Sequence, residues 1–185
     1  MKKILTLLLL VFPIFAIAQE KVSFKLTPQA NFVTTSGEDF VIVPFEGKSA
    51  HEIYQILTSN VVSVYNDASE VMNGVNDELI KIRGFFPVYI KKVLGVSQPW
   101  GGYYQLEFRI KDGRVRVSAP FVEDDISFGL YGTDSFSQVV KKWYKNGEVK
   151  KKEAKHVELI EIQMNGTINA ILGLLSAPTK VDDDW

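Results

Sequence analysis

Hydrophobic and polar residues alternate most clearly between positions 103 and 119, and this pattern predicts a β-hairpin. Tyr104, Leu106, Phe108 and Ile110 share one face of the first strand, and Val115, Val117 and Ala119 share one face of the second. Asp112-Gly113 lies between them and favours a two-residue type I′ turn. That turn pairs Lys111 with Arg114, Ile110 with Val115, Arg109 with Arg116 and Phe108 with Val117. Apolar residues then always face apolar residues, which supports the register.

The same reading along the rest of the chain predicts further strands and helices. Alternation or short apolar runs predict strands at Glu20 to Leu26, Phe40 to Val43 and Leu79 to Arg83. Ser49 and Glu52 form a capping box before apolar residues at helical spacing, which predicts a helix from Ser49 to about Tyr65. A short helix is expected from Ser137 to Tyr144, and a long one from Lys152 to Pro178.

Other segments are harder to interpret from their residues. Asn66 to Asp77 and the acidic stretch between Pro120 and Ser135 resemble loops, and Phe85 to Pro99 resembles an irregular connection. Asn165-Gly166 either weakens the last helix or marks a break in it.

These elements predict an α+β fold of two layers, an antiparallel sheet with helices packed on one face, followed by a C-terminal helical extension. The expected organisation is a sheet domain at 19–130, the extension at 131–178 packing on the same domain, and a polar tail at 179–185.

The order of strand, capped helix, strand and long hairpin between Phe40 and Pro120 resembles a bacterial secreted family of unknown function described as having a TATA-binding-protein-like fold. The residues that carry the resemblance are the Val41-to-Val43 strand, the Gly47-Lys48-Ser49 start of the helix, the Ile80/Ile82 strand and the Tyr104-to-Ala119 hairpin. The resemblance implies an antiparallel sheet with helices on one face, and it assigns no activity.

The first 18 residues have the pattern of a secretory signal peptide. A basic start, Met1-Lys2-Lys3, precedes an apolar run from Ile4 to Ile17, and Ala16-Ile17-Ala18 has the small-x-small pattern of a cleavage site. The run is too short and interrupted for a comfortable membrane span. We therefore expect cleavage near Ala18 and a periplasmic or extracellular protein with no membrane span in the mature chain. An uncleaved N-terminal anchor is the alternative.

Composition and charge narrow the chemistry further. The 185-residue chain has no cysteine, which excludes disulfides, thiolate metal sites and thiol nucleophiles. The formal net charge is −1, and the expected mature chain keeps 19 basic residues (21 − 2) against 22 acidic ones, a charge of −3. An exported acidic protein is a poor candidate for binding nucleic acid.

The hairpin register places basic side chains together on the face opposite the helices. This set comprises Arg109, Lys111, Arg114 and Arg116, and Lys81 and Arg83 join it if Ile80 and Ile82 also point inward. Like charges directly opposed across a hairpin are destabilising, so the arrangement suggests a binding face for an anionic glycan, a lipid headgroup or an acidic protein surface. An ordinary solvated sheet face is the alternative.

Aromatic residues between Pro and Gly offer a second candidate surface. Trp100 and Tyr103, in the stretch Pro99-Trp100-Gly101-Gly102-Tyr103, are suited to stacking on a sugar or a peptide, although such residues also cover sheet edges.

Catalytic signatures are scarce. Neither His51 nor His156 has zinc-site spacing, and the nucleophile-elbow and phosphate-loop motifs are missing from the sequence. Glu123-Asp124-Asp125 and Asp182-Asp183-Asp184 lack the alternating spacing of a calcium loop.

Together these observations predict a non-enzymatic binding or interaction module of the bacterial envelope, without cofactor or metal. A cryptic periplasmic hydrolase using long-range carboxylates or His51 remains an alternative, because paired catalytic acids can be distant in sequence. A purely structural protein is the third reading.

Overall fold

Seven antiparallel strands form one curled sheet in the computed structural model, which describes residues 20–65, 67–93, 96–127 and 133–174. The strands are β3 (Phe40–Pro44), β4 (Met72–Val75), β5 (Leu79–Val93), β6 (Val96–Lys111), β7 (Arg114–Ser118), β8 (Phe121–Ser127) and β9 (Thr133–Ser135). Their order is β3-β7-β6-β5-β4, and β8 follows β7 along the same side of β6 before pairing with β9.

Two short strand pairs and four helices complete the described fold. The pairs are β1 (Lys25–Leu26) with β2 (Phe32–Val33), and β10 (Tyr144–Lys145) with β11 (Glu148–Val149). The helices are α1 (Ala50–Val64), α2 (Ala68–Val71), α3 (Phe136–Trp143) and α4 (Ala154–Ile171). None of these described helices is long and apolar enough to span a membrane.

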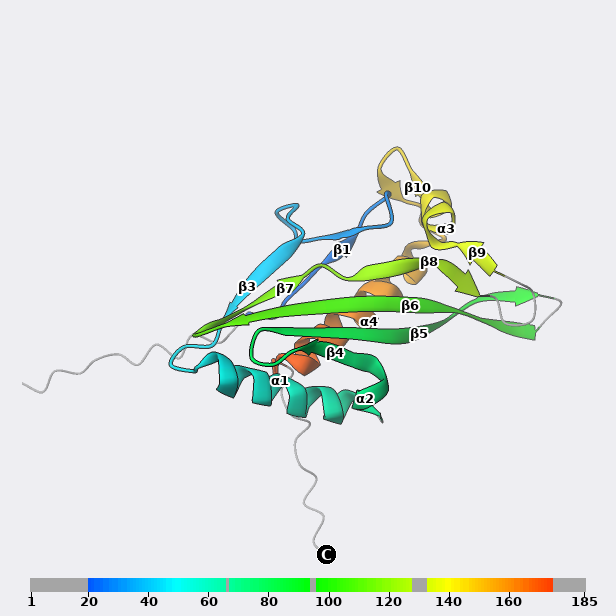
Figure 1. The fold of residues 1–185 in the computed structure, drawn as a ribbon. Helices are drawn as coiled ribbons and strands as arrows, with labels where there is room; N and C mark the ends of the chain where they lie inside the picture. Colours follow the sequence, from blue (N-terminus) through cyan, green and yellow to red (C-terminus); the bar gives the residue numbers. More distant parts are fainter. Residues whose placement is uncertain (1–19, 66, 94–95, 128–132, 175–185) are drawn as a thin grey trace, which may run out of the picture.

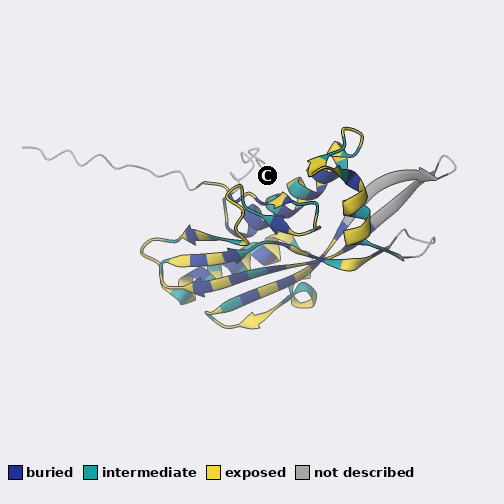
Figure 2. Ribbon diagram, turned by 90° about the horizontal axis from the view of Figure 1, so that it is seen from above, coloured by how far each residue is buried: buried dark blue, intermediate teal, exposed yellow. Residues whose placement is uncertain are grey.

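Helices α1 and α4 cover one face of the sheet, and the opposite face is open (Figure 1). Buried apolar residues alternate with exposed ones along the strands (Figure 2). The inward positions include Ile80, Ile82, Leu106, Phe108, Val115 and Val117, which meet Ile53, Leu57 and Val61 of α1 and Ile160, Met164 and Ile168 of α4 in one core. The α+β class with an antiparallel sheet and helices on one face is confirmed.

The central hairpin has the predicted register but not the predicted turn. Lys111 pairs with Arg114 and Arg109 with Arg116, as expected. Gly113 has a positive φ of 72°, whereas Asp112 does not, so the type I′ prediction is wrong because that turn needs both. The Asp112 carboxylate instead accepts a hydrogen bond from the Ala50 N–H at 2.7 Å, and the Gly113 N–H donates to the Lys48 carbonyl. The turn is therefore shaped by its contact with the start of α1.

Several segments expected to be loops belong to the sheet. The stretch after Asn66 contains α2 and the edge strand β4, and the acidic stretch after Pro120 contains β8 and β9. The irregular connection expected from Phe85 to Pro99 is the distal part of the long β5–β6 hairpin. The acidic residues of β8 are accommodated in a strand because their side chains have hydrogen-bond partners. Glu123 accepts from Arg83, and Asp124 accepts from the Ser137 N–H near the start of α3.

Helix α4 is continuous through Asn165-Gly166, because its polar side chains hold the N-terminal segment. Asn169 accepts from the Val22 N–H at 2.9 Å and donates to the Val22 carbonyl at 2.8 Å. Asn165 makes the same two bonds with Phe24, at 2.8 and 2.9 Å. Four residues of helix rise about 6 Å and two residues of strand about 6.7 Å, so alternate residues of an extended chain match this helix face.

Candidate functional site: the open face of the sheet

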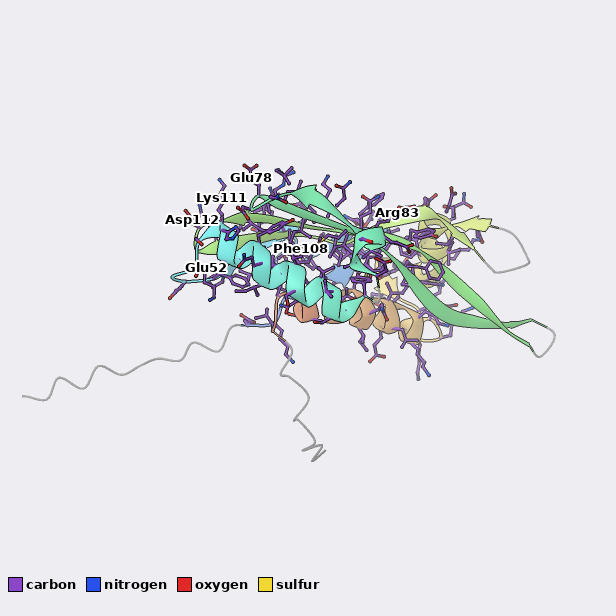
Figure 3. The ribbon with its side chains drawn as sticks, turned by 60° about the horizontal axis from the view of Figure 1, so that its bottom comes forward. Glu52, Glu78, Arg83, Phe108, Lys111 and Asp112 are labelled. Carbon is purple, nitrogen blue, oxygen red and sulfur yellow. The ribbon has the colours of Figure 1, made fainter. Side chains whose placement is uncertain are left out.

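The open face carries all six basic side chains that the sequence placed there. Lys81 and Arg83 stand on β5, Arg109 and Lys111 on β6, and Arg114 and Arg116 on β7, and all are exposed. They do not form one cluster, however. Lys111 lies at the hairpin turn beside Asp112, and Arg83 lies far along the strands (Figure 3).

Four of the six bases line a single pocket at the turn end of the face. We call the set Ile42, Arg109, Lys111, Arg114 and Arg116 the basic pocket; its volume is about 350 Å³. Ile42 pairs with Arg116 across β3 and β7, and its side chain is 51% exposed. The pocket therefore combines an apolar wall with four cationic groups.

The cations of the basic pocket are unevenly compensated. Arg109 donates to Glu107 at 2.7 Å, and the Arg116 guanidinium carbon lies 4.3 Å from the centre of the Phe40 ring. Among the described residues, no carboxylate lies within ion-pair distance of Lys111, Arg114 or Arg116. These three cations therefore form no described ion pair, although Asp77, Glu78 and Asp112 line the neighbouring cavity together with Lys111 and Arg114.

Glu107 separates the basic pocket from the other two bases. It bonds Arg109 at 2.7 Å and Lys81 at 3.2 Å. Burial alone would raise the pKa of Glu107, but the hydrogen bonds from Arg109 and Lys81 outweigh burial and hold the pKa below its ordinary value. The carboxylate is therefore ionised at neutral pH, and Arg109 and Lys81 share its single negative charge.

Arg83 is engaged by its own neighbours. Its guanidinium donates to both oxygens of Glu123, at 2.7 and 2.8 Å, and stacks over the Tyr103 ring at 3.7 Å. These hydrogen bonds lower the pKa of Glu123 and raise that of Arg83. Arg83 is thus a paired side chain remote from the basic pocket.

Of the two aromatic candidates, the structure describes the side chain of Tyr103 only. Tyr103 lies on the open face and is half-exposed, with Phe85 edge-on to its ring at 5.5 Å and Arg83 over its face. The Trp100 side chain lies outside the described residues, although its backbone pairs with Val88. The stacking surface stays a prediction, and the ring face of Tyr103 that Arg83 covers is already occupied.

The hydrolase alternative has one geometric feature. The Nδ1 atom of His51 lies 3.0 Å from Asp77, and its Nε2 atom lies 2.8 Å from the Gln55 side chain. Both members of the His51–Asp77 pair are substantially exposed. Within the described ranges, no group of three or more His, Cys, Asp or Glu residues is placed to hold a metal ion. A His–Asp pair alone supplies no nucleophile, so the hydrolase stays a hypothesis.

Two features of the site are not among the residues predicted from the sequence. Ile42 and Phe40 were assigned only to a short strand, yet they flank the bases because β3 pairs with β7. Glu123 was assigned to a solvated acidic loop, yet it neutralises Arg83. The outward alternation of Phe40 and Ile42 along β3 is the signal that points to their position.

Taken together, the fold and the site define an α+β protein with a helix-covered face and an open, partly basic face. Its fold is similar to that in the crystal structure of a DUF4468 family protein from Bacteroides ovatus ATCC 8483, with a TM-score of 0.57 and 12% sequence identity. The match covers 89% of this chain and 94% of that chain. No family model and no curated protein matches the chain.

Identity this low shows similarity of fold alone. The neighbour belongs to a family of unknown function, in agreement with the predicted resemblance to an uncharacterised bacterial family. The more specific TATA-binding-protein-like description and the predicted export remain predictions.

Proposed function

We propose that this protein is an exported, non-enzymatic binding module whose basic pocket takes an anionic ligand or partner. The observation that carries the proposal is the convergence of Arg109, Lys111, Arg114 and Arg116 on one pocket, with described carboxylate compensation only at Arg109. Opposed like charges cost stability in a hairpin. Retaining them around one turn is reasonable if an anion neutralises them.

The pocket suits an anionic group attached to a larger molecule. Ile42 offers an apolar contact beside the cations, and guanidinium groups bind carboxylate, sulfate or phosphate through paired hydrogen bonds. A glycan, a lipid headgroup and an acidic protein surface share this chemistry. The experiment must therefore separate soluble polyanions from membranes.

The test compares two double variants that remove the same charge. Arg114→Ser with Arg116→Ser alters the basic pocket, whereas Lys141→Ser with Lys142→Ser alters exposed lysines in the last turn of α3. Arg109 is kept because its loss would free Glu107 and confound the result. Binding to dextran sulfate is measured by titration calorimetry at several salt concentrations.

At about 0.5–1 kcal/mol per exposed charge contact, the pocket variant should bind dextran sulfate about 5- to 30-fold more weakly and with a smaller salt dependence. The lysine variant should bind nearly as the unaltered protein does. Phosphatidylglycerol vesicles serve as the second probe, and retention on them would identify a lipid headgroup as the source of the anion. Equal binding by both variants contradicts the proposal.

A further inference from the structure

A groove of about 770 Å³ runs between the edge of β3 that faces away from β7 and the N-terminal segment 20–23. Its lining comprises Glu20 to Ser23, Thr34 to Ser36, Glu38 and the whole of β3. It shares Ile42 with the basic pocket, so the two cavities are contiguous at that residue. The groove therefore borders the site of the proposed function.

One wall of the groove is the edge of β3 that faces away from β7. The Ala119 N–H donates to the Asp39 carbonyl, and the Phe45 N–H donates to the Gly113 carbonyl, so odd-numbered residues of this strand bond β7. Backbone groups alternate in direction along an antiparallel strand. The N–H and C=O groups of Phe40 and Ile42 therefore point into the groove, where they have no backbone partner among the described residues.

The opposite wall repeats the same alternation. Val22 and Phe24 direct their backbone groups toward Asn169 and Asn165 of α4. Because successive residues of an extended chain point in opposite directions, Lys21 and Ser23 direct theirs away from α4. Both β3 and the N-terminal segment thus present backbone donors and acceptors, at every second residue, to a ligand in the groove.

The dimensions suit one added strand. At ordinary sheet spacings, five residues of strand occupy about 17 Å by 4.8 Å by 10 Å, or about 800 Å³. Exposed sheet edges recruit further strands, and proteins usually blunt them with charge or proline. In β3 the run Phe40-Val41-Ile42-Val43 is uncharged, and Pro44 stands only at its end.

Charge on the open face indicates the chemistry of the occupant. Arg116 is on β7, but its guanidinium lies over the Phe40 ring on β3 and so leans toward the free edge. A strand added beside β3 would place alternate side chains next to Ile42, within reach of this cation. The groove itself is lined by Glu20, Lys21 and Glu38, and Glu38 is four residues from Ile42, about 13 Å away in extended chain. Acidic side chains on the added strand are therefore favoured at the Ile42 end.

From these observations we infer that the anionic partner is a protein that adds an extended acidic segment as a strand to the β3 edge. The inference rests on the proposed function and specifies its partner class. The added strand is antiparallel, like all neighbours in this sheet, and alternates acidic residues beside Ile42 with apolar residues facing inward. Backbone hydrogen bonds supply affinity, and Arg116 with its neighbours supplies selectivity.

Synthetic peptides test this with the full chain. The probe is a seven-residue capped peptide in which glutamate and valine alternate, and its control has the same residues in two blocks. Fluorescence anisotropy should show at least tenfold tighter binding of the alternating peptide. In an antiparallel strand the outward glutamates direct their N–H groups at β3, so N-methylation of the glutamate amides should abolish that advantage.

A variant pair tests the same edge from the protein side. Ile42→Pro removes the N–H that faces the groove without removing a bond to β7, whereas Ile42→Thr keeps that N–H and changes only the side chain. The proline variant should bind the alternating peptide about fivefold more weakly or worse, matching one lost backbone hydrogen bond of about 1 kcal/mol. The threonine variant should retain the preference for alternation.

The outcomes separate the two proposals. If both peptides bind equally and N-methylation has no effect while dextran sulfate still binds through the basic pocket, strand addition is refuted and anion binding stands. If neither the peptides nor dextran sulfate binds, the proposed function fails as well. Loss of the preference for the alternating peptide in Ile42→Pro, with that preference retained in Ile42→Thr, supports strand addition specifically.

Discussion

Replacing Asn169 by alanine should destabilise the protein because this side chain substitutes for a neighbouring strand. Asn169 is 4% exposed, and its amide accepts from the Val22 N–H and donates to the Val22 carbonyl. The variant leaves both backbone groups of Val22 without these partners in the interior. The surrounding contacts are apolar, since Val22 and Ile168 belong to the core.

The magnitude follows from these two bonds. Each contributes about 1 kcal/mol, and burial of the unsatisfied groups adds about 1–2 kcal/mol. Alanine forms helix better than asparagine by about 0.6 kcal/mol, which offsets part of the loss. The expected decrease in the free energy of unfolding is therefore about 2–3 kcal/mol.

Guanidinium chloride unfolding followed by circular dichroism measures this loss. Gln163→Ala serves as the control, because Gln163 is exposed on the same helix and the Thr167 hydroxyl donates to its backbone carbonyl, which alanine keeps. The control should change stability by less than about 0.5 kcal/mol. A loss below about 1 kcal/mol for Asn169→Ala would refute the idea that α4 holds the N-terminal segment through these bonds.

Two further variants probe the sheet itself. A Cβ at Gly102 would lie 2.7 Å from the Ile126 Cγ2 atom, so Gly102→Ala should cost about 1–3 kcal/mol in thermal unfolding, and less in an Ile126→Ala background. The Arg83 hydrogen bonds hold the pKa of Glu123 below its unfolded value near 4.5, so this carboxylate stabilises the fold above that pH and loses its contribution as the pH falls through the folded pKa. Glu123→Gln should therefore be less stable than the unaltered protein at about pH 7, and the urea unfolding midpoints should converge as the pH falls through the folded pKa of Glu123; a difference that stays constant as the pH is lowered would contradict this.

The sequence was most informative where local pattern and burial agree. The hairpin register follows from strict alternation, because a slip of one residue would turn Phe108 and Val117 outward. The start of α1 follows from the Ser49–Glu52 capping box, which the structure contains in full. These features depend on neighbours in sequence and need no tertiary information.

The secondary-structure predictions were wrong or left open where contacts with residues distant in sequence stabilise the segment. Asn165-Gly166 is unfavourable in an isolated helix, yet α4 continues because Asn165 binds Phe24, 141 residues away. The acidic strand β8 is unfavourable by composition, yet Glu123 meets Arg83 across the sheet. In the candidate site, alternation predicted which bases share a face, but only the strand order shows that Ile42 completes their pocket.

The distribution of acids on the open face explains why binding is expected at one end of it. Glu107 and Glu123 are both held ionised by adjacent bases, so Arg83 is neutralised by Glu123, and Lys81 and Arg109 share the single charge of Glu107. Beyond them, Arg114 and Lys111 oppose each other directly across the hairpin and form no described ion pair, although Asp112 stands in the turn between them. An anionic group bound there relieves this repulsion as well as making its own contacts, whereas the same group near Arg83 would have to displace Glu123. Selectivity for the turn end therefore follows from where the acids are, more than from where the bases are.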